Sequence, residues 1–185
     1  PHVALTELCK ARDVLRDLAK SSELKVRGMF VEYDQEAFKL LQRLLRDKFP
    51  SIDSAAYNGE FEAYIPQACQ FATEGSQPFA FVFIDPTGWT GYGLKAITPL
   101  LRVRRGEVLI NFMTKDISRF VDDADSSALQ SFIDLFGDMG YREAWRGLRD
   151  LDREDRIVDA YCSRVLSAGD FAHCVATVIL NPRHD

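Results

Sequence analysis

The sequence predicts an α/β protein with a doubly wound, mostly parallel sheet and helices on both faces. Short apolar runs rich in β-prone residues alternate along the 185 residues with segments whose apolar residues recur at helical spacing. This alternation is typical of βαβ units, whose right-handed crossovers pair the strands in parallel. Residues 79–84 form an unbroken apolar run, which is typical of a central strand buried on both faces. No internal repeat or long linker interrupts the chain, so we expect a single domain over residues 1–185.

The first half of the chain contains three helical patterns and two strand patterns. Asp34 is a suitable N-cap for the second helix, and Asn58-Gly59 is a strong turn signal after the second strand. The apolar face of the first helix comprises Ala4, Leu8, Ala11, Leu15 and Leu18. The expected elements are a helix over 3–19, a strand over 26–31, a helix over 35–48, a strand over 52–57, and a helix over 61–71 that restarts at Pro66.

The second half begins with the strand over 79–84 and is mostly helical after the next strand. Asp85-Pro86 ends the first of these strands, because proline has no N–H to donate to a ladder. The further elements expected are a helix over 94–101 despite Pro99, a strand over 107–113, helices around 117–121, 129–136 and 157–165, and a final strand over 171–180.

Composition and charge limit the classes of partner. The chain is 46% hydrophobic and 28% charged, which is ordinary for a soluble globular protein, and its net charge is −5. There is thus no overall positive field for nucleic acid, although a local basic patch stays possible. No apolar run approaches the roughly 20 residues of a membrane span and no signal peptide is present, so we expect no membrane partner.

The cysteines and histidines show no pattern of a metal site or a catalytic triad. The four cysteines, at 9, 69, 162 and 174, include no C-x-x-C pair, and the three histidines lie far apart in the sequence. We therefore expect buried free thiols, no metal centre, and a reducing, cytoplasmic setting.

Polar residues end three of the expected strands. These residues are Glu32, Asp85 and Asn111, and parallel strands place their carboxyl ends along one edge of the sheet, where open α/β sheets bind ligands. An acid after the second strand of a nucleotide-binding half commonly accepts both ribose hydroxyls, which suggests this role for Glu32. The alternative is a helix cap or turn residue, but Asp34 already fills the cap position.

Two further stretches are candidate binding sites. Asn58 or Glu60 would accept a hydrogen bond from an adenine amino group if Glu32 held the ribose; the alternative is a turn with a solvated acid. In Asp85-Pro86-x-x-Trp89, Asp85 would accept from a substrate amine, Pro86 would keep the backbone extended, and Trp89 would stack on a base. The alternative is a strand-ending aspartate followed by a core tryptophan.

Five arginines recur at helical spacing near the carboxyl end, which suggests either a phosphate-binding stripe or a solvated face with ion pairs. Acidic residues lie between them, and this favours the second interpretation. The arginines are at positions 142, 146, 149, 153 and 156.

Four segments, taken in order, resemble a known family. They are VRGMFVEYDQEAFKLL, FAFVFIDPTGWTGYGLKAITPLL, EVLINFMTKDISRFV and REDRIVDAYCSRVL. Together they are similar to the three-Cys-motif partner proteins, bacterial relatives of class I, S-adenosylmethionine-dependent methyltransferases. The resemblance covers the chain from Pro1 to about Leu180, and the cysteines of the family name belong to a companion protein.

The resemblance implies S-adenosylmethionine as cofactor, with Glu32 at the ribose and Asn58 and Glu60 near the adenine. Asp85-Pro86 would occupy the position of the Asp/Asn-Pro-Pro-aromatic motif of amino-methyltransferases, which suggests an amino group of a nucleic-acid base as methyl acceptor. The sequence departs from that motif, because Thr87 replaces the second proline, Gly88 replaces the aromatic residue, and Trp89 comes one residue late.

The family's first strand and glycine-rich loop would precede Pro1, and its closing strand would follow Leu180, so we expect a fragment that lacks both.

Two alternatives for the function remain open. The chain would be a methyltransferase-like enzyme or a catalytically inactive, methyltransferase-shaped module that binds the companion three-Cys-motif protein. A dehydrogenase is a weaker alternative, because no glycine fingerprint for a dinucleotide is visible.

Overall fold

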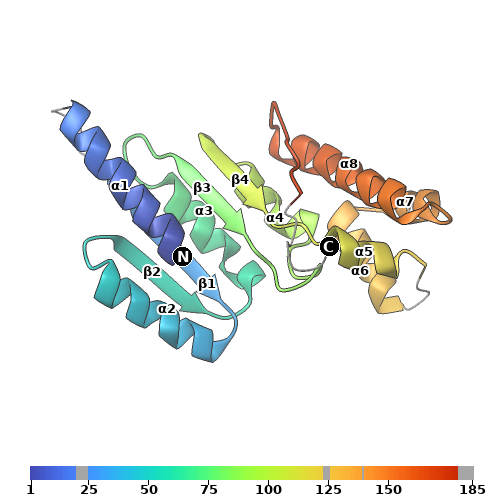
Figure 1. The fold of residues 1–185 in the computed structure, drawn as a ribbon, viewed down its shortest axis with the longest axis horizontal. Helices are drawn as coiled ribbons and strands as arrows, with labels where there is room; N and C mark the ends of the chain where they lie inside the picture. The colour runs from blue at the N-terminus through green and yellow to red at the C-terminus, as the bar shows by residue number, and fades with distance from the viewer. Residues whose placement is uncertain (20–24, 123–125, 139, 179–185) are drawn as a thin grey trace. The chain divides into compact units, whose positions relative to one another are not determined.

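The computed structural model is a mixed α/β structure that describes residues 1–19, 25–122, 126–138 and 140–178. Its contacts divide the chain into two compact units, Pro1–Tyr64 and Ile65–Asp185, and each unit is described by itself. Each contains one pair of parallel strands (Figure 1). The predicted α/β class and the parallel pairing are therefore confirmed, whereas one doubly wound sheet and a single domain stay predictions.

The first unit consists of two helices, two strands and a short 3-10 helix. Strands β1 and β2 pair in parallel, with Arg27 opposite Asp53 and Glu32 opposite Asn58, and α2 is the crossover between them. Figure 1 shows α2 lying along this pair of strands. The elements are α1 (His2–Ala19), β1 (Arg27–Glu32), α2 (Gln35–Lys48), β2 (Asp53–Asn58) and η1 (Phe61–Tyr64).

Helix α2 begins where the sequence predicts. The carboxylate of Asp34 accepts a hydrogen bond from the backbone N–H of Ala37 at 2.7 Å, which satisfies one of the unpaired N–H groups of the first turn. At the other end, the N–H of Phe49 bonds to the carbonyl of Leu45, and Pro50 follows. The predicted helix over 35–48 and its cap are thus confirmed.

The core of the first unit is formed by residues of α1, of α2 and of the segment between α2 and β2. It is made by Leu5, Leu41, Leu45, Phe49 and Ile52. The apolar face that the sequence predicts for α1 is instead exposed, at 45% for Leu8 and 75% for Leu18. Helical spacing shows that a face is apolar but not what covers it, and no described residue covers this one.

The second unit contains the other strand pair and most of the helices. Strands β3 and β4 are parallel and lie side by side in Figure 1, and α8 packs against α4 and α5. The helix that restarts at Pro66, the helix that contains Pro99, and the later helices are confirmed. Residues 61–64, predicted as the start of a helix, form a 3-10 turn, and α7 was not predicted. The elements are α3 (Ile65–Thr73), β3 (Ala80–Ile84), α4 (Leu94–Leu101), β4 (Gly106–Ile110), α5 (Thr114–Phe120), α6 (Ser126–Phe136), α7 (Gly140–Trp145) and α8 (Asp150–Gly169).

The core of the second unit is rich in aromatic rings. Phe132 and Phe136 on α6 are almost fully buried and lie 6.1 Å apart, and Trp145 on α7 lies 5.1 Å from Phe136. Ile97, Leu100 and Leu101 of α4 are buried as well. Large aromatic side chains supply much of the buried apolar area in such a core, so the helices of this unit are held mainly by these contacts.

Two predictions for the second unit are wrong. The run over 79–84 is not buried on both faces, because Phe81 and Phe83 are 55% and 54% exposed, and Leu109 on β4 is half exposed as well. No described residue covers this face of the strand pair. The predicted final strand over 171–180 is also not formed: residues 171–178 have no regular secondary structure, and residues 179–180 lie outside the described part.

Among the described residues, no helix combines the length and the apolar character that crossing a membrane requires.

Replacing the cap of α2 tests the confirmed start of that helix. We expect Asp34→Ala to lower the free energy of unfolding by about 1 kcal/mol, because the first turn loses its side-chain acceptor. Asp34→Asn keeps an acceptor oxygen and should change stability by a few tenths of a kcal/mol, roughly. Urea denaturation measures both. An equal loss in the two variants would show that the negative charge matters more than the cap.

Candidate functional site

The candidate residues form one polar cluster in each unit. The Glu32 cluster comprises Glu32, Asn58 and Gly59 at the carboxyl ends of β1 and β2. The Asp85 cluster comprises Asp85 and Asn111 directly after β3 and β4. Each cluster is described within its own unit.

The register of the first strand pair places Glu32 opposite Asn58. The side-chain N–H₂ of Asn58 donates to the carbonyl oxygens of Glu32 at 2.8 Å and of Tyr33 at 3.0 Å. Only the nitrogen of the amide can donate to two carbonyls, so these bonds fix the orientation of the amide. Both of its hydrogens are used, and the oxygen of Asn58 is left as an acceptor for a ligand.

One oxygen of the Glu32 carboxylate is held by the turn into α2. Glu32 Oε1 accepts from the backbone N–H of Asp34 at 3.0 Å, and the side chain is half-buried. Among the described residues, no arginine or lysine forms an ion pair with Glu32. Oε2 can therefore accept hydrogen bonds, and Oε1 has one lone pair left.

Gly59 closes this end of the strand pair. Its N–H donates to the carbonyl of Glu32 at 3.1 Å, and its φ of 150° lies in the region that favours glycine. A Cβ at this position would lie 3.1 Å from the ring of Tyr64, whose hydroxyl donates to the carbonyl of Asn58. The predicted turn at Asn58-Gly59 is thus confirmed, and Tyr64 is a neighbour that the sequence did not indicate.

Glu60 lies next to this cluster but outside the strand. Its side chain is exposed, and its carbonyl accepts from Ala63 as the 3-10 helix begins. The structure gives Glu60 no contact with Glu32, so its proposed contact with an adenine stays a prediction.

In the second unit, the structure brings Asp85 and Asn111 together. The side-chain N–H₂ of Asn111 donates to Asp85 Oδ1 at 2.7 Å, and the backbone N–H of Asn111 donates to the carbonyl of Ile84 at 2.9 Å. The carboxylate is exposed, and Oδ2 is left as an acceptor. Pro86 follows, half-buried, and carries the chain away from the ladder.

Trp89 packs inside the second unit. Its ring stacks on Phe120 at 5.3 Å and meets Phe132 at 5.0 Å, and only 8% of the residue is exposed. These contacts agree with the packing alternative for Trp89 and leave little of its surface for a base.

An aromatic layer that the sequence did not indicate lies behind the Asp85 cluster. Phe112, the residue after Asn111, stacks on Tyr161 of α8 at 4.1 Å, and Tyr92 meets Tyr161 edge to face. Burial raises the pKa of the Tyr92 and Tyr161 hydroxyls well above the ordinary value of a phenol. Neither hydroxyl has a hydrogen-bond partner among the described groups. The sequence offers one hint of this aromatic layer, which is the placement of Tyr92 between two glycines.

The arginines near the carboxyl end do not line up as a phosphate-binding stripe. Arg146 and Arg149 form surface ion pairs with acids three residues away, at 3.1 and 3.2 Å, as the interleaved acids suggested. Arg142 is buried over the ring of Phe132, and Arg153 is paired with Asp122 at 3.1 Å. No three His, Cys, Asp or Glu side chains in the described part lie together as a metal site would require.

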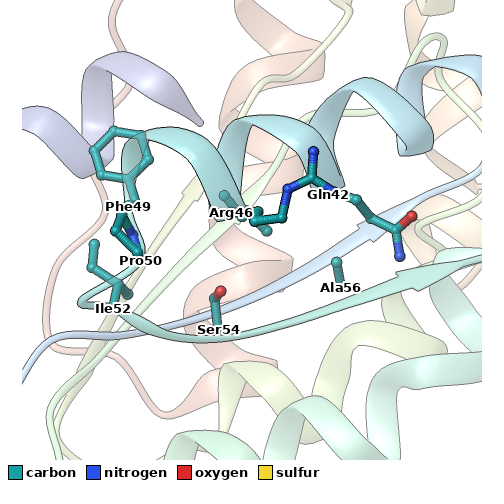
Figure 2. A pocket seen from close by; sticks show the side chains of 8 residues that line it. Gln42, Arg46, Phe49, Pro50, Ile52, Ser54 and Ala56 are labelled. Carbon is teal, nitrogen blue, oxygen red and sulfur yellow. The ribbon is translucent and has the colours of Figure 1, made fainter.

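A groove in the first unit lies away from the candidate residues. It has a volume of about 560 Å³ and runs between α2 and β2, beneath the side chains of Gln42 and Arg46 (Figure 2). Its other walls come from Leu45 on α2, from Ser54 and Ala56 within β2, and from Phe49, Pro50 and Ile52, which precede that strand. Neither Glu32 nor Asn58, which ends the strand, lines the groove. Ligands of open α/β sheets bind beyond the carboxyl ends of the strands, so this groove does not extend the Glu32 cluster.

No protein-family model, no curated protein and no solved structure matches the chain. The resemblance to the three-Cys-motif partner proteins therefore stays a prediction.

A double-mutant cycle tests the contact between Asp85 and Asn111. We expect a coupling free energy of about 0.5–1 kcal/mol between Asp85→Ala and Asn111→Ala, because the hydrogen bond is charge-assisted but exposed. Urea denaturation of the four proteins gives this value. Asp85 and Glu107 form the control pair: Glu107 faces Phe81, four residues before Asp85, roughly 13 Å along the strand. Equal coupling in both pairs would argue against a specific Asp85–Asn111 contact.

Proposed function

We propose that this chain is a class I, S-adenosylmethionine-dependent methyltransferase-like protein of the three-Cys-motif partner type. The observation that carries the proposal is the Glu32 cluster. A carboxylate at the end of β1, fixed by the N–H of Asp34, retains acceptor positions beside the acceptor oxygen of Asn58. The sequence resemblance implies the same roles, with Glu32 at the ribose of the cofactor and Asn58 near its adenine.

The chemistry of the Glu32 cluster fits the nucleoside part of this cofactor. A ribose diol donates two hydrogen bonds, which Glu32 can accept, and an adenine amino group donates to an oxygen such as that of Asn58. The acids Glu32, Asp34 and Glu60 also favour a ligand without phosphate groups. When bound, S-adenosylmethionine supplies an activated methyl group on a sulfonium.

Asp85 is the proposed residue for the methyl acceptor. Asn111 holds one oxygen of its carboxylate, and the other can accept from a substrate amine such as that of a nucleic-acid base. Transfer of a methyl group requires mainly that the nucleophile be oriented, so no nucleophilic triad is needed. Pro86 directs the chain away from this position. Trp89 takes a packing role in this proposal, because its ring is enclosed by Phe120 and Phe132.

Binding of S-adenosylhomocysteine tests the role of Glu32. With the full-length protein, we expect titration calorimetry to give a binding heat, and Glu32→Ala to weaken the affinity about tenfold or more. The reason is the loss of charge-assisted hydrogen bonds to the ribose. Glu36→Ala is the matched control, because Glu36 is an exposed acid in the first turn of α2, four residues from Glu32, and its carboxylate pairs with Lys39. No heat, or an unchanged affinity for Glu32→Ala, would contradict the proposal.

The second candidate function is a catalytically inactive module that binds a companion three-Cys-motif protein. The observation in its favour is the apolar face of β3 and β4, where Phe81, Phe83 and Leu109 are exposed. Exposed apolar patches of this kind commonly mark interaction surfaces.

Copurification with the companion protein distinguishes the two functions. If the module is a docking protein, Asp85→Ala should copurify as the unsubstituted protein does, and Phe83→Ser should reduce the recovered companion severalfold, because the apolar contact area falls. Circular dichroism and thermal unfolding check that both variants are folded. Full recovery with Phe83→Ser together with binding of S-adenosylhomocysteine would instead favour the enzyme.

A further inference from the structure

The groove between α2 and β2 lies along an outer edge of the first strand pair. Its walls come from α2, from the segment before β2 and from β2 itself, and no residue of β1 lines it. Strand β2 pairs with β1 on one side, and among the described residues it has no partner strand on the other. The groove therefore opens beside the unpaired side of β2 and not between the two strands.

The ladder to β1 shows which backbone groups of β2 point to this unpaired side. The N–H of Gly59 donates to the carbonyl of Glu32, and the N–H and C=O groups of successive residues in a parallel strand point alternately to the two sides. Counting back from Gly59, Ala55 faces β1, whereas Ser54 and Ala56 direct their N–H and C=O groups outward. Two donors and two acceptors, about 6.6 Å apart along the strand, are thus available to an added strand.

The side chains of the same two residues line the groove. Figure 2 shows Ser54 and Ala56 on β2 below α2, from which Gln42 and Arg46 reach over the groove. A strand added to β2 would place every second side chain on this face, next to α2. The rest of the lining is apolar and consists of Leu45, Phe49, Pro50 and Ile52.

The charge of the groove indicates which side chain its occupant would carry. Arg46 is the one charged residue among the described residues that line the groove, although the net charge of the chain is −5. Asp47 accepts from the Nε of Arg46 at 2.9 Å, but this pair is exposed, and the two terminal N–H₂ groups of the guanidinium can donate to a second carboxylate. The acid that begins β2, Asp53, is paired with Arg27. The groove therefore suits an acidic side chain with apolar neighbours.

The edge of β2 lacks the features with which natural proteins block strand addition. Between Asp53 and Asn58 there is no charged residue and no proline, and the register with β1 runs without a bulge. A second copy of the chain is a poor occupant, because its β2 would bring only Ser54 and Ala56 to a groove of about 560 Å³. The occupant must carry larger side chains.

We propose that the edge of β2 binds an extended peptide segment of another protein, which adds as a strand, with apolar side chains over the floor of the groove and an acidic side chain at Arg46. Main-chain hydrogen bonds to Ser54 and Ala56 supply affinity, and the groove supplies specificity, as strand addition generally requires. No residue of the Glu32 cluster lines the groove, so this surface is independent of the proposed cofactor site.

Amide hydrogen exchange of the full chain, followed residue by residue by NMR, tests whether the edge is free. We expect the N–H groups of Ser54 and Ala56 to exchange at least about tenfold faster than that of Ala55, which bonds to β1. Equal protection of the three groups, or protection that rises with protein concentration, would overturn the proposal, because the chain itself or a second copy would then cover the edge.

Selection from a phage-displayed library of random linear peptides tests the occupant. We expect the full chain to enrich peptides in which apolar residues and an acid occupy alternate positions. A synthetic peptide of this group should slow the exchange of Ser54 and Ala56 and leave that of Ala55 unchanged. Arg46→Glu should weaken its affinity about tenfold, because the acid of the peptide then meets a like charge. Replacing that acid by lysine should restore the affinity for Arg46→Glu.

Arg43→Glu is the matched control, because Arg43 is an exposed arginine on α2 that does not line the groove. It should leave the affinity unchanged, and circular dichroism checks that both variants are folded. The proposal is overturned if no peptide is enriched, if the enriched peptides leave the exchange of Ser54 and Ala56 unchanged, or if the two variants have the same affinity. The exchange measurements use the unsubstituted chain, so they do not depend on the folding of any variant.

Discussion

Parallel pairing in register is the constraint on which both polar clusters depend. It sets Glu32 opposite Asn58 in one strand pair, and in the other it sets Ile84 opposite Ile110, so that the next residues, Asp85 and Asn111, are neighbours. Parallel strands also require a crossover, and α2 begins only two residues after β1. The turn into that helix brings the N–H of Asp34 to the carboxylate of Glu32. A slip of one residue in either pair would move these side chains to the other face.

The two clusters share a chemical character. In each, an amide side chain donates within the protein, through both N–H groups at Asn58 and through one at Asn111, and carboxylate oxygens and the amide oxygen of Asn58 remain as acceptors. Such groups suit ligands that donate hydrogen bonds, such as diols and amines, and they disfavour phosphate groups. The proposed cofactor and amine acceptor have this chemistry, whereas a dinucleotide would bring its pyrophosphate to an acidic surface.

Local signals in the sequence predicted local structure well, because their causes lie within a few residues. The cap at Asp34, the turn at Asn58-Gly59 and the restart at Pro66 depend on backbone hydrogen bonds between near neighbours. Coverage of an apolar face depends instead on distant elements. For this reason an apolar run such as 79–84 predicted a strand correctly but its burial wrongly. For Trp89, likewise, the sequence left both binding and packing open, and the choice depends on Phe120 and Phe132, far along the chain.

The aromatic layer behind Asp85 links the Asp85 cluster to α8. Tyr161 on α8 stacks on Phe112 at 4.1 Å, and Phe112 follows Asn111, which holds Asp85. Tyr161 is buried and also meets the ring of Tyr92 edge to face. Close packing of this kind transmits small displacements, but proximity alone does not couple two sites, because an element with two discrete states must bias both. The rings therefore hold the end of β4, which Asn111 follows, against α8, and the position of Asp85 depends on this packing through its hydrogen bond to Asn111.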